Sequence, residues 1–188
     1  MCRDFNTGRY GLAGFGTNTA AIAAGGHSGT GVSALTEIWN GSSWTEVGDL
    51  NDPRGYLNGG AGSTTAGLVF GGDGPNATAN TESWNGSSWT EVNNLNTARW
   101  HMFGAGSQSS ALGFGGYSPP GYHALTEDWN GVSWVEVADM STGRSGGGSA
   151  GVSDSTTALA FGGATPSSTA GTEEWSGSSN TTKTISTD

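Results

Sequence analysis

Short apolar runs alternate with glycine-rich and polar segments along most of the chain. One stretch begins with a small, Gly-rich segment (56–62) and continues with the apolar run AGLVFGG (66–72). A polar loop (73–79) follows, and then two short segments that contain Trp, Thr and Glu (80–84 and 87–92). Short apolar runs bounded by Gly and polar turn residues are typical of β-strands. This pattern therefore predicts four short strands and almost no helix.

The same succession of segments occurs four times, so the chain is an internal repeat. An arginine recurs every 45 residues and divides the chain into the units 9–53, 54–98, 99–143 and 144–188. A twelve-residue motif, TEIWNGSSWTEV at 36–47, recurs late in each unit, and its fourth copy is altered. The repeated positions are the arginines Arg9, Arg54, Arg99 and Arg144; the motif glutamates Glu37, Glu82, Glu127 and Glu173; the first tryptophans Trp39, Trp84, Trp129 and Trp175; and the second tryptophans Trp44, Trp89 and Trp134, with Asn180 at the fourth place. The spacing predicts one domain over residues 1–188, built from four similar units.

The centre of the motif is an Asn-Gly pair between two predicted strands, which indicates a β-hairpin with a type I′ turn. If Asn40 and Gly41 form a two-residue turn, Trp39 and Trp44 are diagonal neighbours; if the loop has four residues, they lie directly opposite each other. Both registers place the two tryptophans on one face, because side chains alternate along a strand. We expect that face to be buried. One unit cannot cover it alone, so neighbouring units must pack on one another.

Paired glycines follow the apolar strand of each unit, at 25–26, 71–72, 115–116 and 162–163, and in the first three units an Arg follows the second Trp by ten residues. With four predicted strands and a 45-residue period, this combination resembles the kelch repeat over nearly the whole chain. The resemblance implies an all-β fold, a β-propeller of four four-stranded antiparallel blades. It also implies that the segment after each Arg is the innermost strand. The chain departs from the kelch pattern at one position: the WN pair has Trp where the kelch repeat more usually has Tyr.

Residues 1–8 are predicted to close the ring. The sequence of residues 4–6 matches that of 49–51, which follows an outer strand. We therefore expect Met1–Phe5 to lie beside the last outer strand, within 180–187. Inner strands poor in bulky residues suit a narrow axis, and only the fourth unit lacks its second Trp. These features favour a closed monomeric ring; the alternative is an open arc that needs a second chain.

The repeated arginines admit two interpretations. They could form a ring of cations for a ligand, or each could pair with the motif glutamate inside its own unit. A position repeated in every unit serves what every unit needs, and a buried charge is tolerated when it is paired. The structural pair is the favoured interpretation.

Composition excludes several classes of function. The net charge is −10, with six Lys and Arg residues, whereas nucleic-acid binders carry a basic face, so we expect no nucleic acid partner. No apolar run is long enough to span a membrane, and the N-terminus has no apolar signal-peptide region. Cys2 is the only cysteine.

Some kelch-type propellers are copper radical oxidases that need Tyr and His ligands and a Cys–Tyr crosslink. No spacing here gathers such a set, and we expect no metal and no cofactor.

The loops after the glycine pairs differ between units while the strands repeat. They span 27–34, 73–79, 117–124 and 164–171. Binding residues tend to lie on loops held by a rigid scaffold, so these loops are the candidate site for a protein or glycan partner, although solvated connections would look the same. The candidate contact residues are His27, Asp73, Trp100, Tyr117, Tyr122 and His123.

These observations favour a non-catalytic binding or display module. The wording of the repeat, the low lysine content and the abundance of Gly, Ser and Thr resemble repeats of bacteriophage and marine bacterial surface proteins. That resemblance implies a virion or cell-surface adhesion component, and a virion or extracellular location. The alternatives are an intracellular protein-interaction propeller and an enzyme of the copper-oxidase type.

Overall fold

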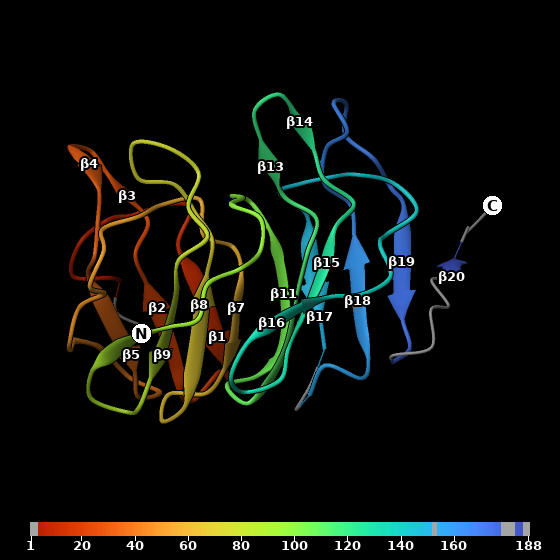
Figure 1. Ribbon diagram of the computed structural model, residues 1–188. Coiled ribbons are helices and arrows are strands. Elements are labelled where there is room, and N and C mark those ends of the chain that lie inside the picture. The colour runs from red at the N-terminus through yellow and green to blue at the C-terminus, as the bar shows by residue number, and fades with distance from the viewer. Residues whose placement is uncertain (1–3, 152–153, 178–182, 186–188) are drawn as a thin grey trace.

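Four twisted β-sheets stand side by side in chain order (Figure 1). The computed structural model describes residues 4–151, 154–177 and the backbone of 183–185, and these residues form strands, turns and loops with no helix. Each sheet is antiparallel and has four strands, and we call it a blade. The strands, from inner to outer, are β1 (Ala13–Gly16), β2 (Ala21–Ala24), β5 (Thr36–Trp39) and β6 (Trp44–Glu46) in blade 1; β7 (Gly60–Gly62), β8 (Gly67–Phe70), β9 (Thr81–Trp84) and β10 (Trp89–Val92) in blade 2; β11 (Phe103–Ser107), β12 (Ser110–Phe114), β15 (Thr126–Trp129) and β16 (Trp134–Glu136) in blade 3; and β17 (Gly148–Ala150), β18 (Ala158–Phe161), β19 (Thr172–Trp175) and β20 (Lys183–Ile185) in blade 4.

The inner strands are those that follow the arginines, as predicted. Strands β1, β7, β11 and β17 contact one another in succession and line a common cavity of about 390 Å³. Small residues are required there because the backbones approach closely: a β-carbon at Gly104 would lie 2.6 Å from the Gly60 nitrogen. This cavity marks the propeller axis.

The hairpin of the repeated motif has a four-residue loop. Trp39 pairs directly with Trp44, and Asn40 Oδ1 accepts hydrogen bonds from the backbone N–H groups of Ser42 and Ser43. The two-residue type I′ turn is therefore wrong, because only Gly41 has a positive φ and the Asn40 side chain caps the loop instead. The consequence for the tryptophans is unchanged: they share a face, and their ring centroids lie 5.6 Å apart.

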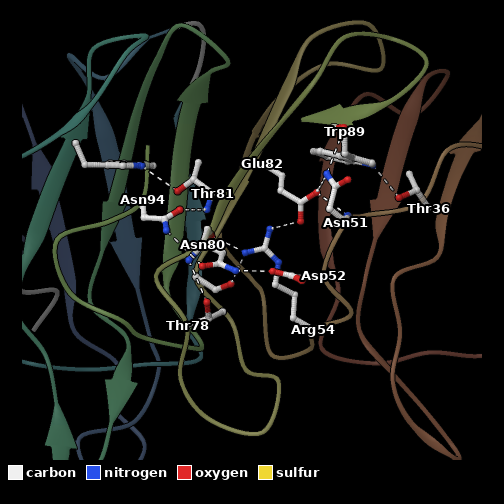
Figure 2. Close-up of polar contacts among 12 residues, drawn as sticks. Thr36, Asn51, Asp52, Arg54, Thr78, Asn80, Thr81, Glu82, Trp89 and Asn94 are labelled. Atoms are coloured by element: carbon white, nitrogen blue, oxygen red, sulfur yellow. Dashed lines mark hydrogen bonds and ion pairs between the residues drawn. The ribbon is translucent and has the colours of Figure 1, made fainter. Parts of the chain in front are cut away.

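The Trp face is buried wherever another blade covers it. Trp84, Trp89, Trp129 and Trp134, which another blade covers, are 0–5% exposed. On the free side of blade 1, Trp39 is 9% exposed and Trp44 is only half-buried. The first Trp of each motif donates its indole N–H to a turn of its own blade, as Trp84 does to the Thr64 carbonyl at 2.9 Å. The second Trp donates to the preceding blade, as Trp89 does to Thr36 Oγ1 at 3.0 Å (Figure 2). The motif thus joins neighbouring blades.

The arginines and glutamates form buried ion pairs within each blade. Arg54 Nη2 donates to Glu82 Oε1 at 2.9 Å, and its Nη1 donates to the carbonyls of Gly71 and Asn80 (Figure 2). The second carboxylate oxygen accepts from the backbone and side chain of Asn51. Equivalent pairs are Arg9–Glu37, Arg99–Glu127 and Arg144–Glu173. Burial lowers the pKa of Arg54 and Arg99, and the facing glutamates oppose that effect. The geometry agrees with the structural interpretation.

The segment before Arg9 packs on blade 1. The Phe5 ring lies 4.4 Å from the Trp44 ring, and Asn6 binds Glu37 as Asn51 binds Glu82, which confirms the match between residues 4–6 and 49–51. Residues 1–3, 178–182 and 186–188 lie outside the described residues, so the expected contact of Met1–Phe5 with 180–187 is untested. Among the described residues, no substantial contact joins β17 back to β1, and blades 1 and 4 stand at opposite sides in Figure 1. Ring closure stays a prediction.

Candidate binding face

The variable loops emerge together at one end of the blades. Two short hairpins, β3 (His27–Ser28) with β4 (Gly31–Val32) and β13 (Tyr117–Ser118) with β14 (Gly121–Tyr122), project at that end (Figure 1). We call this end the loop face. The motif hairpins, such as 39–44, turn at the opposite end, because β5 runs antiparallel to β2. The loops after the glycine pairs therefore share one surface, as the sequence predicted.

Repeated backbone positions at the loop face carry different side chains. The residue after each Arg hydrogen-bonds through its backbone N–H to the residue after the glycine pair in the same blade, as Trp100 does to the Tyr117 carbonyl at 3.0 Å. These pairs are Tyr10–His27, Gly55–Asp73, Trp100–Tyr117 and Ser145–Ala164. Blades 1 and 3 place two rings there, whereas blade 4 places only small residues. An identical frame thus presents a surface that differs from blade to blade.

Four rings form a continuous row across blades 1 to 3. Tyr10 stacks on His27 with ring centroids 5.2 Å apart, His27 lies 4.4 Å from Tyr56, and Tyr56 lies 4.4 Å from His101. Asp73 Oδ1 lies 3.2 Å from His27 Nε2 and accepts a hydrogen bond in the imidazole tautomer that carries its proton on Nε2. We call Tyr10, His27, Tyr56 and His101 the aromatic row. It offers flat apolar faces with polar groups at their edges.

Tyr56 and His101 occupy backbone positions that favour glycine. The second residue after the Arg has a positive φ in every blade: Gly11 at 61°, Tyr56 at 45°, His101 at 51° and Gly146 at 69°. A left-handed conformation costs an L-residue about 1–2 kcal/mol, and Gly avoids that cost in blades 1 and 4. Blades 2 and 3 carry Tyr and His in spite of it. Strain of this kind concentrates at functional sites, which makes these two side chains the strongest candidates for a contact with a ligand.

A second aromatic group lies beside the aromatic row in blade 3. Trp100 and Tyr117 rings lie 5.5 Å apart, and Tyr117 meets the edge of Tyr122 at 5.1 Å. His123 does not join them; its Nε2 lies 2.8 Å from Ser118 Oγ and supports the β13–β14 hairpin. All three rings are half-buried and keep part of their surface in solvent.

Burial disfavours the charged form of two of the three histidines. Burial lowers the pKa of His101, which nearby Asp73 raises and His27 lowers further. Burial also lowers the pKa of His123, with a smaller effect from Arg99. The pKa of the Tyr56 phenol is raised, chiefly by its polar contact with Tyr10. Within the aromatic row, burial thus disfavours the charged form of His101, and the contact with Tyr10 disfavours that of Tyr56.

A depression of about 530 Å³ lies on the loop face between blades 1 and 2. Its wall includes Asp52, whose Oδ2 accepts from Asn80 Nδ2 at 2.6 Å, and Thr78, whose hydroxyl accepts from the Asn80 N–H (Figure 2). The positions equivalent to Asp52 and Asn80 in the next unit are occupied by Thr97 and Leu125. This polar pair is specific to one blade junction, so the depression differs from its counterparts.

The structure unites the predicted residues in two groups and adds others. His27 and Asp73 come together, and Trp100, Tyr117 and Tyr122 come together, while His123 serves its own hairpin. The sequence analysis missed Tyr10, Tyr56 and His101 as contact residues; for Tyr56 and His101, a non-Gly residue where the two other units have Gly was the available signal. In the part of the chain that the structure describes, no three His, Cys, Asp or Glu side chains gather as metal ligands, and no helix could span a membrane.

Four four-stranded blades with adjacent inner strands define the protein as a β-propeller. No protein-family model matches the chain, and no curated protein matches it. Among solved structures, that of YjhT superposes with a TM-score of 0.79 at 14% sequence identity, over 97% of this chain and 70% of YjhT. The two proteins share the fold.

Proposed function

We propose that the chain is a non-catalytic binding module that recognises a glycan through the aromatic row and the neighbouring rings of blade 3. The single observation that supports this most is the placement of Tyr56 and His101 at left-handed positions that the other blades give to Gly. A purely structural position would favour Gly here, since it removes the strain.

Sugars suit this surface chemically. Their C–H faces pack on aromatic rings, and their hydroxyls need donors and acceptors at the ring edges. The aromatic row supplies both, together with Asn58, whose Oδ1 lies 3.4 Å from His101 Nδ1. The depression beside Asp52 and Asn80 adds further polar groups within the same face. A partly exposed aromatic surface on a protein with a net charge of −10 suits uncharged or cationic ligands better than phosphate.

The test compares binding with stability in one set of variants. The intact chain is screened on an oligosaccharide array, and the affinity for any ligand found is measured by calorimetry. Tyr56→Gly and His101→Gly should each reduce binding at least tenfold. They should leave the free energy of unfolding within about 1 kcal/mol, because relief of roughly 1–2 kcal/mol of strain offsets the lost ring contact and the added freedom of the unfolded chain.

Val132→Ser is the matched control, because Val132 is 68% exposed on the motif hairpin at the opposite end. If that change abolishes binding while the two Gly variants bind normally, the proposed face is wrong. If the array shows no ligand, the glycan is the wrong partner class.

The wider setting we propose is a virion or cell-surface adhesion component, which rests on the resemblance of the repeat described above. An intracellular protein-interaction propeller would use the same loop face, and the array separates the two. An enzyme of the copper-oxidase type is the remaining alternative, and metal analysis of the purified chain separates it from a binding module.

A further inference from the structure

The two end blades carry matching halves of the interface that joins neighbouring blades. Within the chain, that interface occurs three times and reuses the same contacts. One face of blade 1 packs against blade 2, and no described blade covers its other face. Blade 4 has an uncovered face of the complementary kind. We call these the leading face of blade 1 (Phe5, the Arg9 carbonyl, Leu12 and Trp44) and the trailing face of blade 4 (Phe161, Gly162, the Gly163 N–H and Thr172).

Backbone hydrogen bonds show the match first. The second Gly of each pair donates to the carbonyl of the next blade's Arg at 2.9 Å: Gly26 to Arg54, Gly72 to Arg99 and Gly116 to Arg144. Among the described residues, the Gly163 N–H has no such acceptor and the Arg9 carbonyl has no such donor. They are the donor and the acceptor of a fourth bond.

The side-chain hydrogen bond follows the same rule. Trp89 Nε1 donates to Thr36 Oγ1 and Trp134 Nε1 donates to Thr81 Oγ1, both at 3.0 Å across a blade junction (Figure 2 shows the first). Within the described part of the chain, Trp44 Nε1 on the leading face and Thr172 Oγ1 on the trailing face have no partner. Thr36 and Thr81 are buried, whereas Thr172 is half-buried.

The first glycine of each pair leaves room for apolar side chains at the blade junction, and we call this space the socket. A β-carbon at Gly25 would lie 2.4 Å from Leu57 Cδ1 and 3.2 Å from Leu50 Cδ1, so the glycine makes room for both. At Gly162 it would meet only the Thr169 carbonyl, at 3.7 Å, so that socket is empty. The residues equivalent to Leu50 and Leu57 in blade 1 are Phe5 and Leu12, and both are only half-buried.

Phe161 leaves apolar surface open on the trailing face of blade 4. This side chain is 43% exposed, whereas Phe70 and Phe114, at the same position of blades 2 and 3, are 0% and 4% exposed. The difference arises because the following blade covers Phe70, whose ring lies 4.8 Å from Trp134, and no described residue does the same for Phe161. The trailing face thus has an exposed Phe161 and an empty socket at Gly162. The leading face has the partly exposed side chains that match them, Phe5, Leu12 and Trp44.

We propose that the trailing face of one copy binds the leading face of a second copy, head to tail, through the same contacts that join successive blades. The proposed occupant of each end is another molecule of this chain, because the opposite end of the same chain carries the complementary contacts. The contact is heterologous, since different surfaces meet, and each copy can engage two neighbours.

Closure within one molecule is the competing arrangement, and two observations oppose it. The described parts of β1 and β17 make no substantial contact with each other, and blades 1 and 4 stand apart in Figure 1.

Two variants, each blocked at one end, test the proposal. Phe161→Arg places a charge on the trailing face, and Trp44→Arg places one on the leading face; both positions are partly exposed in the single chain. Sedimentation velocity should show the unaltered chain associating as its concentration rises, and each variant alone as a monomer. An equimolar mixture of the two variants should form a 1:1 dimer and nothing larger, because it contains one intact pair of faces. Leu12→Arg replaces Trp44→Arg if the latter fails to fold by circular dichroism.

Three results would overturn the proposal. The first is an unaltered chain that stays monomeric at all concentrations, because the two faces then do not join separate copies. The second is association of either single variant, which indicates another interface. The third is a mixture that remains monomeric.

Discussion

Trp89 and Trp44 occupy the same position of the repeated motif but differ in what covers them. Trp89 is 5% exposed between blades 1 and 2, while Trp44 is half-buried on the leading face. A buried Trp removes about 150–250 Å² from water. At about 25 cal/mol/Å², that burial is roughly 4–6 kcal/mol before entropy, and truncation of buried aromatics to Ala costs about 3–5 kcal/mol. We therefore expect Trp89→Ala to lower the free energy of unfolding by about 3–5 kcal/mol.

Trp44→Ala should cost less, roughly 2 kcal/mol, because part of the ring is already in solvent. Urea unfolding followed by far-ultraviolet circular dichroism measures both losses, at a protein concentration where the chain is monomeric. Thr36→Val isolates the polar part: it leaves the buried Trp89 N–H without its acceptor and should cost about 1–3 kcal/mol. Equal losses for the two Trp variants, or a Trp89 loss below about 1 kcal/mol, would refute the idea that the motif stabilises the fold by packing blade on blade.

Three further outcomes follow from the contacts described above. Glu127→Ala leaves Arg99 buried without its counter-charge and should lower the free energy of unfolding by about 3–5 kcal/mol in urea; a loss under about 1 kcal/mol would show that the pair is solvated. Burial lowers the pKa of His101 in the folded state, so its contribution to the free energy of unfolding is present above the unfolded pKa of about 6.5 and is lost as the pH falls through the folded pKa. The melting temperature of His101→Gln should therefore fall less steeply than that of the unaltered chain below pH 6.5. An identical fall would contradict the burial argument. Gly25→Ala and Gly162→Ala introduce the same backbone strain, at φ 67° and 68°, but only the first collides with Leu57, so its melting temperature should fall further; equal falls would mean that neither socket is filled.

Local patterning was enough to predict the blades. The period of the arginines, the glycine pairs and the short apolar runs predicted four strands per unit and the absence of helix. The resemblance to a known repeat implied which strand is innermost. The structure confirms these points for the residues it describes. The Arg–Glu pairing also followed from sequence, because both residues recur in every unit. Repetition is informative here since a contact between adjacent units must be encoded in every copy.

Only the tertiary structure decided how the unrepeated residues combine. Tyr10, Tyr56 and His101 belong to different units, and they form one row because the inner ends of the blades converge. The hairpin loop length likewise depended on a side chain: Asn40 caps a four-residue loop, which the Asn-Gly pair alone did not distinguish from a tight turn. The leading and trailing faces have no sequence signature, because their residues match buried positions of the inner blades. Their exposure depends on which blade follows, and that is a property of the arrangement in space rather than of any local segment.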